Sequence, residues 1–118
     1  MTGNLDREQA RQPEDLGRFF VRRANDADLD GLVALYEPGA VMATGPGQTA
    51  AGTSAIRQEL ARFLDGRPRL TGESQPAVRL GDLALTSTTF DGGATAEVAR
   101  CQPDGTWLWV IDQPRILR

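Results

Sequence analysis

The sequence predicts an α+β domain in which helices pack on one face of an antiparallel sheet. Three stretches in the first half of the chain repeat apolar residues at three- and four-residue spacing, which is typical of amphipathic helices. From Leu70 onward, short apolar stretches alternate with turns rich in glycine and aspartate, as in strands joined by hairpins. Helices first and hairpin-linked strands afterwards indicate the α+β class.

The first predicted helix begins at Pro13 and runs to about Arg23 or Asn25. Proline fits the first turn of a helix, and the two acidic residues that follow it lie near the positive end of the helix dipole. The apolar residues of one face are Leu16, Phe19, Phe20 and Ala24. A second helix follows, capped by Asp26 or Asp28 and stopped by Pro38-Gly39. Its apolar residues are Leu29, Leu32, Val33 and Tyr36.

The third predicted helix is capped by Thr53 and ends at Gly66. Its apolar face consists of Ile56, Leu60, Phe63 and Leu64. Before it, Ala40 to Ala43 is expected to form a short strand, and Gly45-Pro46-Gly47 a turn or loop. The later predicted strands are Val78–Leu80, Leu83–Phe90, Thr95–Cys101 and Trp107–Ile111.

A chain of 118 residues is close to the usual size of one domain. Residues 1–12 are polar and poor in large apolar groups, so we expect a flexible N-terminal tail followed by a single domain over residues 13–118. The net charge is -3 and the arginines are scattered, which argues against binding of nucleic acid. We find no apolar run that indicates a leader or a membrane span.

The absent residue types exclude several kinds of chemistry. All thirteen basic residues are arginines and histidine is missing, which excludes an internal Schiff-base lysine, a nucleophile with a histidine base, and a histidine-ligated metal. We expect no metal and no cofactor. Cys101 is the single cysteine, so no disulfide can form within the chain, and a lone thiol suits a reducing compartment. The predicted location is cytoplasmic.

The order of elements carries a resemblance. In this chain the order is a first helix, the stretch DLDGLVALYEPGAVM, a short strand, the helical stretch GTSAIRQELARFL, and then strands that close on DGTWLWVIDQP. The order of these elements resembles that of the nuclear transport factor 2-like superfamily, in its SnoaL-like and ketosteroid-isomerase-like branches. The resemblance covers about residues 14–117. It implies a cone-shaped, cystatin-like barrel in which a strongly curved antiparallel sheet wraps around the three helices and encloses an apolar cavity. It also implies an outer sheet face that is often used for dimerisation.

Two working residues of the isomerase are replaced in this chain. Alignment through Tyr36 puts Phe20 where that enzyme has a tyrosine donor, and Thr44 where it has the carboxylate base. Phenylalanine has no O–H to stabilise an oxyanion, and threonine cannot accept a carbon-bound proton near neutral pH. Glu97 falls near the protonated acid of the oxyanion hole. Steroid-type isomerase activity is therefore not expected.

The loop at Pro103-Asp104-Gly105 decides whether Glu97 and Asp112 face each other. A loop of two or four residues places them directly opposite on one face, as an acid/base pair. A three-residue loop, with a type I turn and then glycine in the left-handed conformation, puts them on opposite faces. We favour the three-residue loop because it uses the stereochemical preference of all three residues. Both faces of the hairpin are then largely apolar, so we expect a second subunit to cover the outer face.

Five further residues are candidates for contact with a ligand: Tyr36, Arg57, Arg100, Trp109 and Phe20. Arg100 and Tyr36 are expected with Asp112 at the polar end of the cavity, and Arg57 could reach a carboxylate on a ligand. For the tryptophans, packing in a core or a dimer interface is the alternative to stacking on a flat ligand.

Two functions from different classes remain. The first is a homodimeric small-molecule-binding domain of SnoaL-like type with an apolar cavity and without isomerase activity. Its ligand is a small apolar molecule, and whether that molecule carries a carboxylate or a ketone is left open. The second is a cofactor-free enzyme, a hydrolase, cyclase, dehydratase or isomerase, that acts on an apolar metabolite with Asp112 and Glu97 as acid and base.

Overall fold

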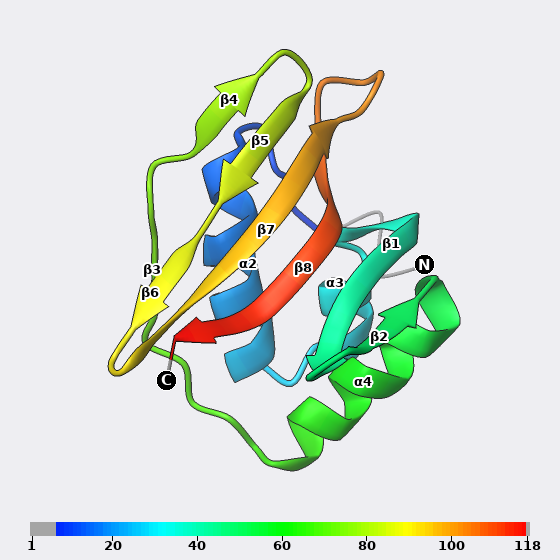
Figure 1. Ribbon diagram of the computed structural model, residues 1–118, viewed down its shortest axis with the longest axis vertical. Helices are drawn as coiled ribbons and strands as arrows, with labels where there is room; N and C mark the ends of the chain where they lie inside the picture. The colour runs from blue at the N-terminus through cyan, green and yellow to red at the C-terminus, as the bar shows by residue number, and fades with distance from the viewer. Residues whose placement is uncertain (1–6, 118) are drawn as a thin grey trace.

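The computed structural model describes residues 7–117, which form helices packed on one side of a single eight-stranded sheet (Figure 1). The helices are α2 (Pro13–Asn25), α3 (Leu29–Val33) and α4 (Thr53–Asp65). The strands are β1 (Tyr36–Gly45), β2 (Gln48–Ala51), β3 (Glu73–Ser74), β4 (Val78–Leu80), β5 (Leu83–Thr86), β6 (Thr88–Phe90), β7 (Gly93–Cys101) and β8 (Trp107–Leu117). The predicted α+β class is confirmed.

The strand order in the sheet is β2-β1-β8-β7-β5-β4, and β6 pairs with both β7 and β3. One neighbouring pair, β1 and β8, is parallel, whereas the other pairs are antiparallel. The sheet is therefore mixed, which corrects the expectation of a wholly antiparallel sheet. Parallel pairing is possible here because the chain between β1 and β8 is long enough for a crossover.

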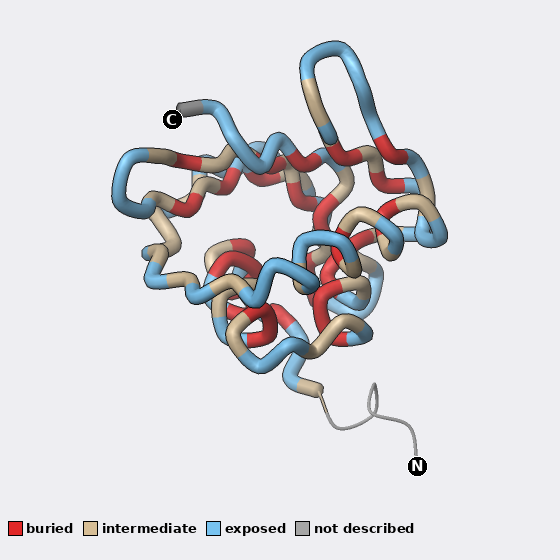
Figure 2. Tube along the Cα trace, turned by 90° about the horizontal axis from the view of Figure 1, so that it is seen from below, coloured by how far each residue is buried: buried red, intermediate tan, exposed pale blue. Residues whose placement is uncertain are grey.

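The sheet curves around α2 and α3, as the view along the layers shows (Figure 2). Buried residues lie on the sides of the helices and of the sheet that face each other. The largest fully buried side chains include Leu16 of α2, Leu32 of α3 and Ile56 of α4. Because one apolar side chain from each helix is sealed against the sheet, the three helices share one core with it.

The ends of α2 and α4 follow from their sequences. Pro13 is the first residue of α2, and the carboxylate of Asp15 accepts hydrogen bonds from the backbone N–H groups of Arg11 and Gln12, each at 3.0 Å. The predicted bounds of α2 are confirmed. Helix α4 also covers the predicted stretch, but its N-cap is Gly52 with φ 88° rather than Thr53, which is the first helical residue.

The second helix is shorter than predicted. It ends at Val33, and Tyr36, which was assigned to its apolar stripe, is the first residue of β1. The backbone N–H of Trp109 donates to the carbonyl of Leu35 at 2.8 Å, and Tyr36 pairs with Trp109 in the sheet. Pairing with a strand distant in sequence therefore overrides the local helical pattern.

Three strand features were missed or merged. The short strands β2 and β3 were not predicted, and the single strand expected over Leu83–Phe90 is divided at Ser87 into β5 and β6. Strand β2 forms a hairpin with β1, in which Gly47 has a φ of 71° that favours glycine. Each of these segments is too short to show a clear period in the sequence.

The packed domain begins before Pro13. Of the predicted tail, residues 1–6 lie outside the described residues, whereas Ala10 is buried and its carbonyl accepts a hydrogen bond from the N–H of Trp107 at 2.9 Å. The guanidinium of Arg7 pairs with Asp28 at 2.6 Å. Within residues 7–117, no helix has the length and apolar character that crossing a bilayer requires.

Candidate acid pair on the inner face

Two carboxylic acids lie side by side on the inner face of the sheet. Glu97 of β7 pairs directly with Asp112 of β8, and on its other side with Thr86 of β5. Asp112 in turn pairs with Met42 of β1. Only 4 % of Glu97 and 5 % of Asp112 remain exposed. Two ionisable groups are thus brought together in the buried layer under the helices.

A β-bulge produces this arrangement. The loop has the favoured three residues, with the N–H of Gln102 bonded to the carbonyl of Thr106 at 2.7 Å and Gly105 at φ 86°. Beside the loop, Ala99 pairs with Trp109, a register that would put the two acids on opposite faces. The next pair is Val98 with Ile111, so Val110 is an extra residue on β8.

The predicted loop is therefore confirmed, but the predicted separation of Glu97 from Asp112 is wrong. The extra residue at Val110 turns Asp112 back to the face of Glu97. Valine at that position gives no sequence signal for a bulge, because β-branched residues are ordinary in regular strands.

The hydrogen bonds around Glu97 have a fixed direction. The indole Nε1 of Trp109 lies 3.0 Å from the hydroxyl of Thr86, which lies 2.6 Å from Oε1 of Glu97. An indole N–H can only donate, so the hydroxyl accepts from Trp109, and toward an ionised Glu97 it directs its own proton to the carboxylate. Thr86 was missed at the sequence level, since it stands in an ordinary run of serine and threonine.

Asp112 is held by Tyr36. The phenolic hydroxyl of Tyr36 donates to Oδ2 of Asp112 at 2.6 Å, and both groups are buried. This contact joins β1 to β8 on the inner face. Burial, followed by the neighbouring charge of Asp112, raises the pKa of Tyr36 above its ordinary value, so the phenol stays protonated and remains a donor.

Both acids titrate close to neutral pH. Burial, followed by the charge of Asp112, raises the pKa of Glu97 to about 7, while hydrogen bonds from Thr86 and Thr95 act in the opposite direction. Burial raises the pKa of Asp112 to about 6, and the hydrogen bond from Tyr36 opposes that rise. Two coupled carboxyl groups of this kind can hold one proton between them near neutral pH.

Four aromatic rings lead from the surface to the acids. The ring of Phe63 lies 6.0 Å from that of Phe20, Phe20 lies 5.9 Å from Trp109, and Trp109 lies 5.4 Å from Tyr36. We call these four residues the aromatic file. Phe63 is 36 % exposed, whereas Trp109 and Tyr36 are buried. The predicted ligand contacts Phe20, Tyr36 and Trp109 are therefore neighbours, joined by Phe63, which had been assigned only to a helix face.

The two predicted arginines lie elsewhere. Arg57 pairs with Asp30 through Nη1 at 2.9 Å in an exposed position, and Nε of Arg100 lies 3.0 Å from Oε2 of Glu37. Arg100 is exposed, so it does not stand with Tyr36 and Asp112 at a polar end of the interior. A guanidinium keeps most of its hydration at the surface and finds a carboxylate there, which explains the outward placement.

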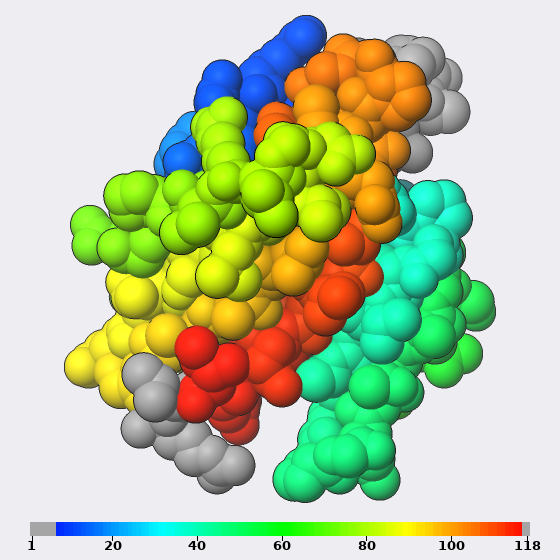
Figure 3. Space-filling view, turned by 45° about the horizontal axis from the view of Figure 1, so that its top comes forward, coloured from blue at the N-terminus to red at the C-terminus, as the bar shows by residue number. Residues whose placement is uncertain are grey.

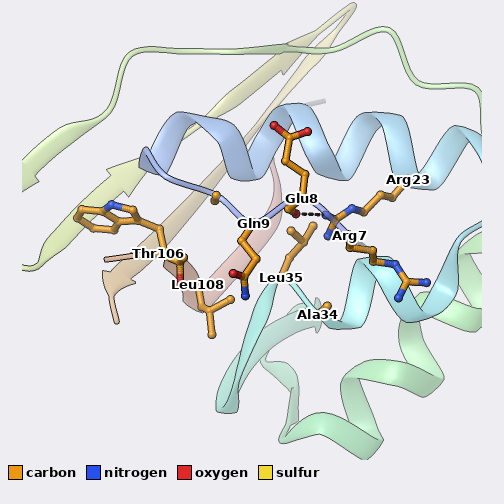
Figure 4. A pocket seen from close by; sticks show the side chains of 10 residues that line it. Arg7, Glu8, Gln9, Arg23, Ala34, Leu35, Thr106 and Leu108 are labelled. Atoms are coloured by element: carbon orange, nitrogen blue, oxygen red, sulfur yellow. Dashed lines mark hydrogen bonds between the residues drawn. The ribbon is translucent and has the colours of Figure 1, made fainter. Parts of the chain in front are cut away.

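A separate pocket of about 190 Å³ lies beside the first residues of β8 (Figure 4). Its lining includes Arg7 and Glu8 of the N-terminal segment, Arg23 of α2, and Leu108 of β8. Arg23 donates to the carbonyl oxygens of Gly31 and Glu8, so its guanidinium holds the N-terminal segment against the domain. Neither acid of the inner face lines this pocket.

Metal ligation has little support in the described chain. Within residues 7–117, no group of three or more cysteine, aspartate or glutamate side chains is arranged so that it could hold a metal ion. The acid pair is a set of two, flanked by uncharged donors. Its chemistry is that of carboxyl groups that accept hydrogen bonds, exchange protons or pair with a cation.

Comparison with known proteins supports the architecture. The model of the SnoaL-like domain family matches residues 17–118. Among solved structures, 263 chains match. One of them is a candidate dehydratase of the nuclear transport factor 2-like family from Streptomyces avermitilis. It is 14% identical to this chain, the match covers 86% of this chain and 92% of that chain, and the TM-score is 0.67. A protein of unknown function with a cystatin-like fold from Nostoc punctiforme has 18% identity, coverage of 88% and 86%, and a TM-score of 0.66.

A nuclear transport factor 2-like protein of unknown function from Shewanella oneidensis is also similar, with 12% identity, coverage of 84% and 92%, and a TM-score of 0.68. At these identities the likeness concerns the fold alone. No curated protein matches this chain at a significant level.

Proposed function

Because the chain belongs to the SnoaL-like domain family of the nuclear transport factor 2-like superfamily, we propose that it binds a small apolar molecule along the aromatic file. The polar end of that molecule lies next to Glu97 and Asp112. The observation that carries the proposal is the burial of two facing acids beside four rings. Buried carboxyl groups cost stability, and perturbed acids of this kind cluster at functional sites.

A binding screen tests this proposal. Neutral aromatic molecules of one and two rings, including 2-(naphthalen-2-yl)ethanol, are titrated into the isotope-labelled protein, and backbone amide shifts are followed by NMR. We expect shifts at Phe20, Phe63 and Trp109, and weaker binding by Trp109→Phe than by its matched control Trp107→Phe, a buried tryptophan outside the aromatic file. The proposal fails if no member of the series shifts these residues.

A second candidate function is proton transfer on the bound molecule without a cofactor. It is favoured by the direct pairing of Glu97 with Asp112 and by pKa values that burial raises to about 7 and about 6. Near neutral pH one carboxyl group of the pair can keep its proton and act as the acid while the other is ionised and acts as the base, a division of roles that hydrolases, cyclases, dehydratases and isomerases use. Steroid-type isomerisation is not proposed, since Phe20 and Thr44 cannot replace the donor and the base.

Dehydration is the first reaction class to screen, since one structure of similar fold is a candidate dehydratase. Turnover should be lost in Glu97→Gln and in Asp112→Asn and kept in Asp65→Asn, an exposed acid of α4. Unchanged turnover in both inner-face variants would exclude this second function. Binding of the neutral probes by the same variants separates a loss of chemistry from a loss of the site.

We also propose a homodimer through the outer sheet face. Five apolar side chains from neighbouring strands form one cross-strand row, the outer row: Val78, Leu85, Val98, Ile111 and Val41. Figure 3 shows their strands side by side on one face of the molecule. Ile111 is 54 % exposed, and a continuous apolar patch of this kind is typical of an interaction surface.

A cytoplasmic location remains our expectation from the lone Cys101.

A further inference from the structure

We infer that the molecule bound at this site carries a positively charged nitrogen on a flat apolar body, so that its class is that of the aromatic amines and ammonium compounds. The inference rests on the proposed function, because it names the ligand class of the same site. The juxtaposition that carries it is two buried acids next to a series of aromatic rings, with the neighbouring arginines turned outward.

The charges of the site favour a cation. The groups that contact the acids are the uncharged donors Tyr36, Thr86 and Thr95. Arg100, which was expected beside Asp112, is paired with Glu37 instead, and Arg57 is paired with Asp30. An anionic ligand would therefore meet only like charge once an acid ionises. A cationic ligand supplies the counter-charge that a buried carboxylate needs, and so offsets part of the cost of its burial.

The rings favour the same class. Trp109 stands between Phe20 and Tyr36, and its indole is joined through Thr86 to Glu97. Aromatic faces attract a cation held within about 6 Å of the ring centre, and the same faces pack against a flat apolar body. The aromatic rings thus provide both an apolar surface for the body of the ligand and a second attraction for its positive charge.

The acids have capacity for N–H donors. A carboxylate has about four places for accepted hydrogen bonds, and the hydroxyl of Tyr36 uses one of those on Asp112. Thr86 and Thr95 use two on Glu97, which leaves places free on both acids. An ammonium group has up to three donors to place, so it can bond to both acids at once where a ketone or a carboxylate cannot.

Phe63 is the most exposed ring of the aromatic file. That ring is 36 % exposed, Phe20 is partly buried, and Trp109 is buried. Helix α2 carries Phe20 and helix α4 carries Phe63. The titratable groups that face the acids are Tyr36 from β1 and the acids themselves. The charged group of the ligand therefore binds at the inner end of the aromatic file, next to Glu97 and Asp112.

The test compares three probes that share one ring system. They are 2-(naphthalen-2-yl)ethylamine, 2-(naphthalen-2-yl)ethanol and 3-(naphthalen-2-yl)propionate, titrated by calorimetry into the full chain at about pH 7.5, where the amine is charged. We expect the amine to bind about tenfold more tightly than the alcohol, because a charge-assisted hydrogen bond is stronger than a neutral one. The propionate should bind most weakly.

Variants locate the effect. In Asp112→Asn, the advantage of the amine over the alcohol should be lost, and a cooperative urea unfolding transition reports an intact fold. The control Asp65→Asn changes an exposed acid of α4 and should leave all three affinities as they are.

The outcomes separate the two proposals. If the alcohol binds and the amine gains nothing, or if the propionate binds most tightly, the ligand class is wrong and the binding function stands. If the amine binds more tightly than the alcohol by the same factor in Asp112→Asn as in the original chain, the charge of the amine is bound elsewhere and the inference is also overturned. If none of the three probes binds, the ligand class and the binding function fail together.

Discussion

Glu97 and Asp112 stand directly opposite each other on β7 and β8, and they do so because β8 carries one extra residue at Val110. Near the loop, the strands pair in the register that a three-residue loop imposes. Past the bulge they pair in the other register. The turn and the acid pair are therefore compatible only through the irregularity between them, which is a common place for a functional device in a sheet.

The stability of the domain should fall as the pH rises from about 4 to about 7. The pKa values of Glu97 and Asp112 are raised in the folded state to about 7 and about 6, so the folded chain binds more protons in this window than the unfolded chain does. Each raised carboxyl group, taken alone, accounts for on the order of 3 kcal/mol of lost unfolding free energy. Urea unfolding at a series of pH values measures the slope.

The matched chain for this measurement is the double variant Glu97→Gln, Asp112→Asn, in which the decline over the same window should be mostly absent. An equal decline in the double variant would mean that other groups are responsible.

Neutralising either acid should stabilise the domain at about pH 7.5. Asp112→Asn removes a buried charge and keeps an oxygen that can accept the hydrogen bond of Tyr36. We expect a gain of about 1 to 3 kcal/mol in unfolding free energy, because the desolvation cost of the carboxylate disappears. The control Asp65→Asn should change stability by less than about 0.5 kcal/mol. A clear loss of stability in Asp112→Asn would show that the carboxylate is favourably paired.

The hydroxyl of Thr86 should be needed for stability. Thr86→Val keeps the shape of the side chain but leaves the indole N–H of Trp109 without its acceptor. Thermal or urea unfolding should show a loss of about 1 to 3 kcal/mol, the usual cost of an unsatisfied buried donor. The pKa of Glu97 should also rise further, since the hydrogen bond from Thr86 lowers it.

The control for this change is Thr49→Val on the exposed strand β2, which should be nearly neutral. Equal effects of the two substitutions would argue against the directed chain from Trp109 to Glu97.

A charge on the outer row should separate the dimer. Ile111→Glu places a carboxylate within the apolar row, and burying it in an interface is costly. Light scattering over micromolar concentrations should give a dimer for the original chain and a monomer for the variant. Gln58→Glu adds a charge on α4, away from the sheet, and should remain dimeric. A monomeric original chain would rule out the proposed interface.

The elements whose ends are set by nearby residues could be predicted from the sequence. The bounds of α2, the stretch of α4 and the strand Val78–Leu80 follow from period and from proline and glycine stops, and the resemblance to the SnoaL-like family is confirmed by the family match. Gly105 adopts the left-handed conformation that its place in the turn predicts.

What sequence reasoning missed depends on partners distant in the chain. Tyr36 leaves the helical pattern because it pairs with Trp109, and Arg100 lies on the outer face because it is two residues from Val98 on β7, where it pairs with Glu37. The bulge at Val110 has no local signature. It compensates for a difference in register between the two ends of one hairpin, which becomes visible only when both strands are placed.

The bulge also couples two surfaces that look independent. Ile111 of the outer row and Asp112 of the acid pair are consecutive, and Val98 and Glu97 are consecutive opposite them. If Val110 were paired regularly, the register of Ala99 with Trp109 would continue, and Ile111 would lie opposite Glu97 on the inner face while Asp112 would lie opposite Ala96 on the outer face. Deletion of Val110 would instead leave Ile111 opposite Val98 and Asp112 opposite Glu97, without a bulge between the two registers. One irregularity of β8 therefore decides which of two consecutive side chains meets the interior and which meets the outer row.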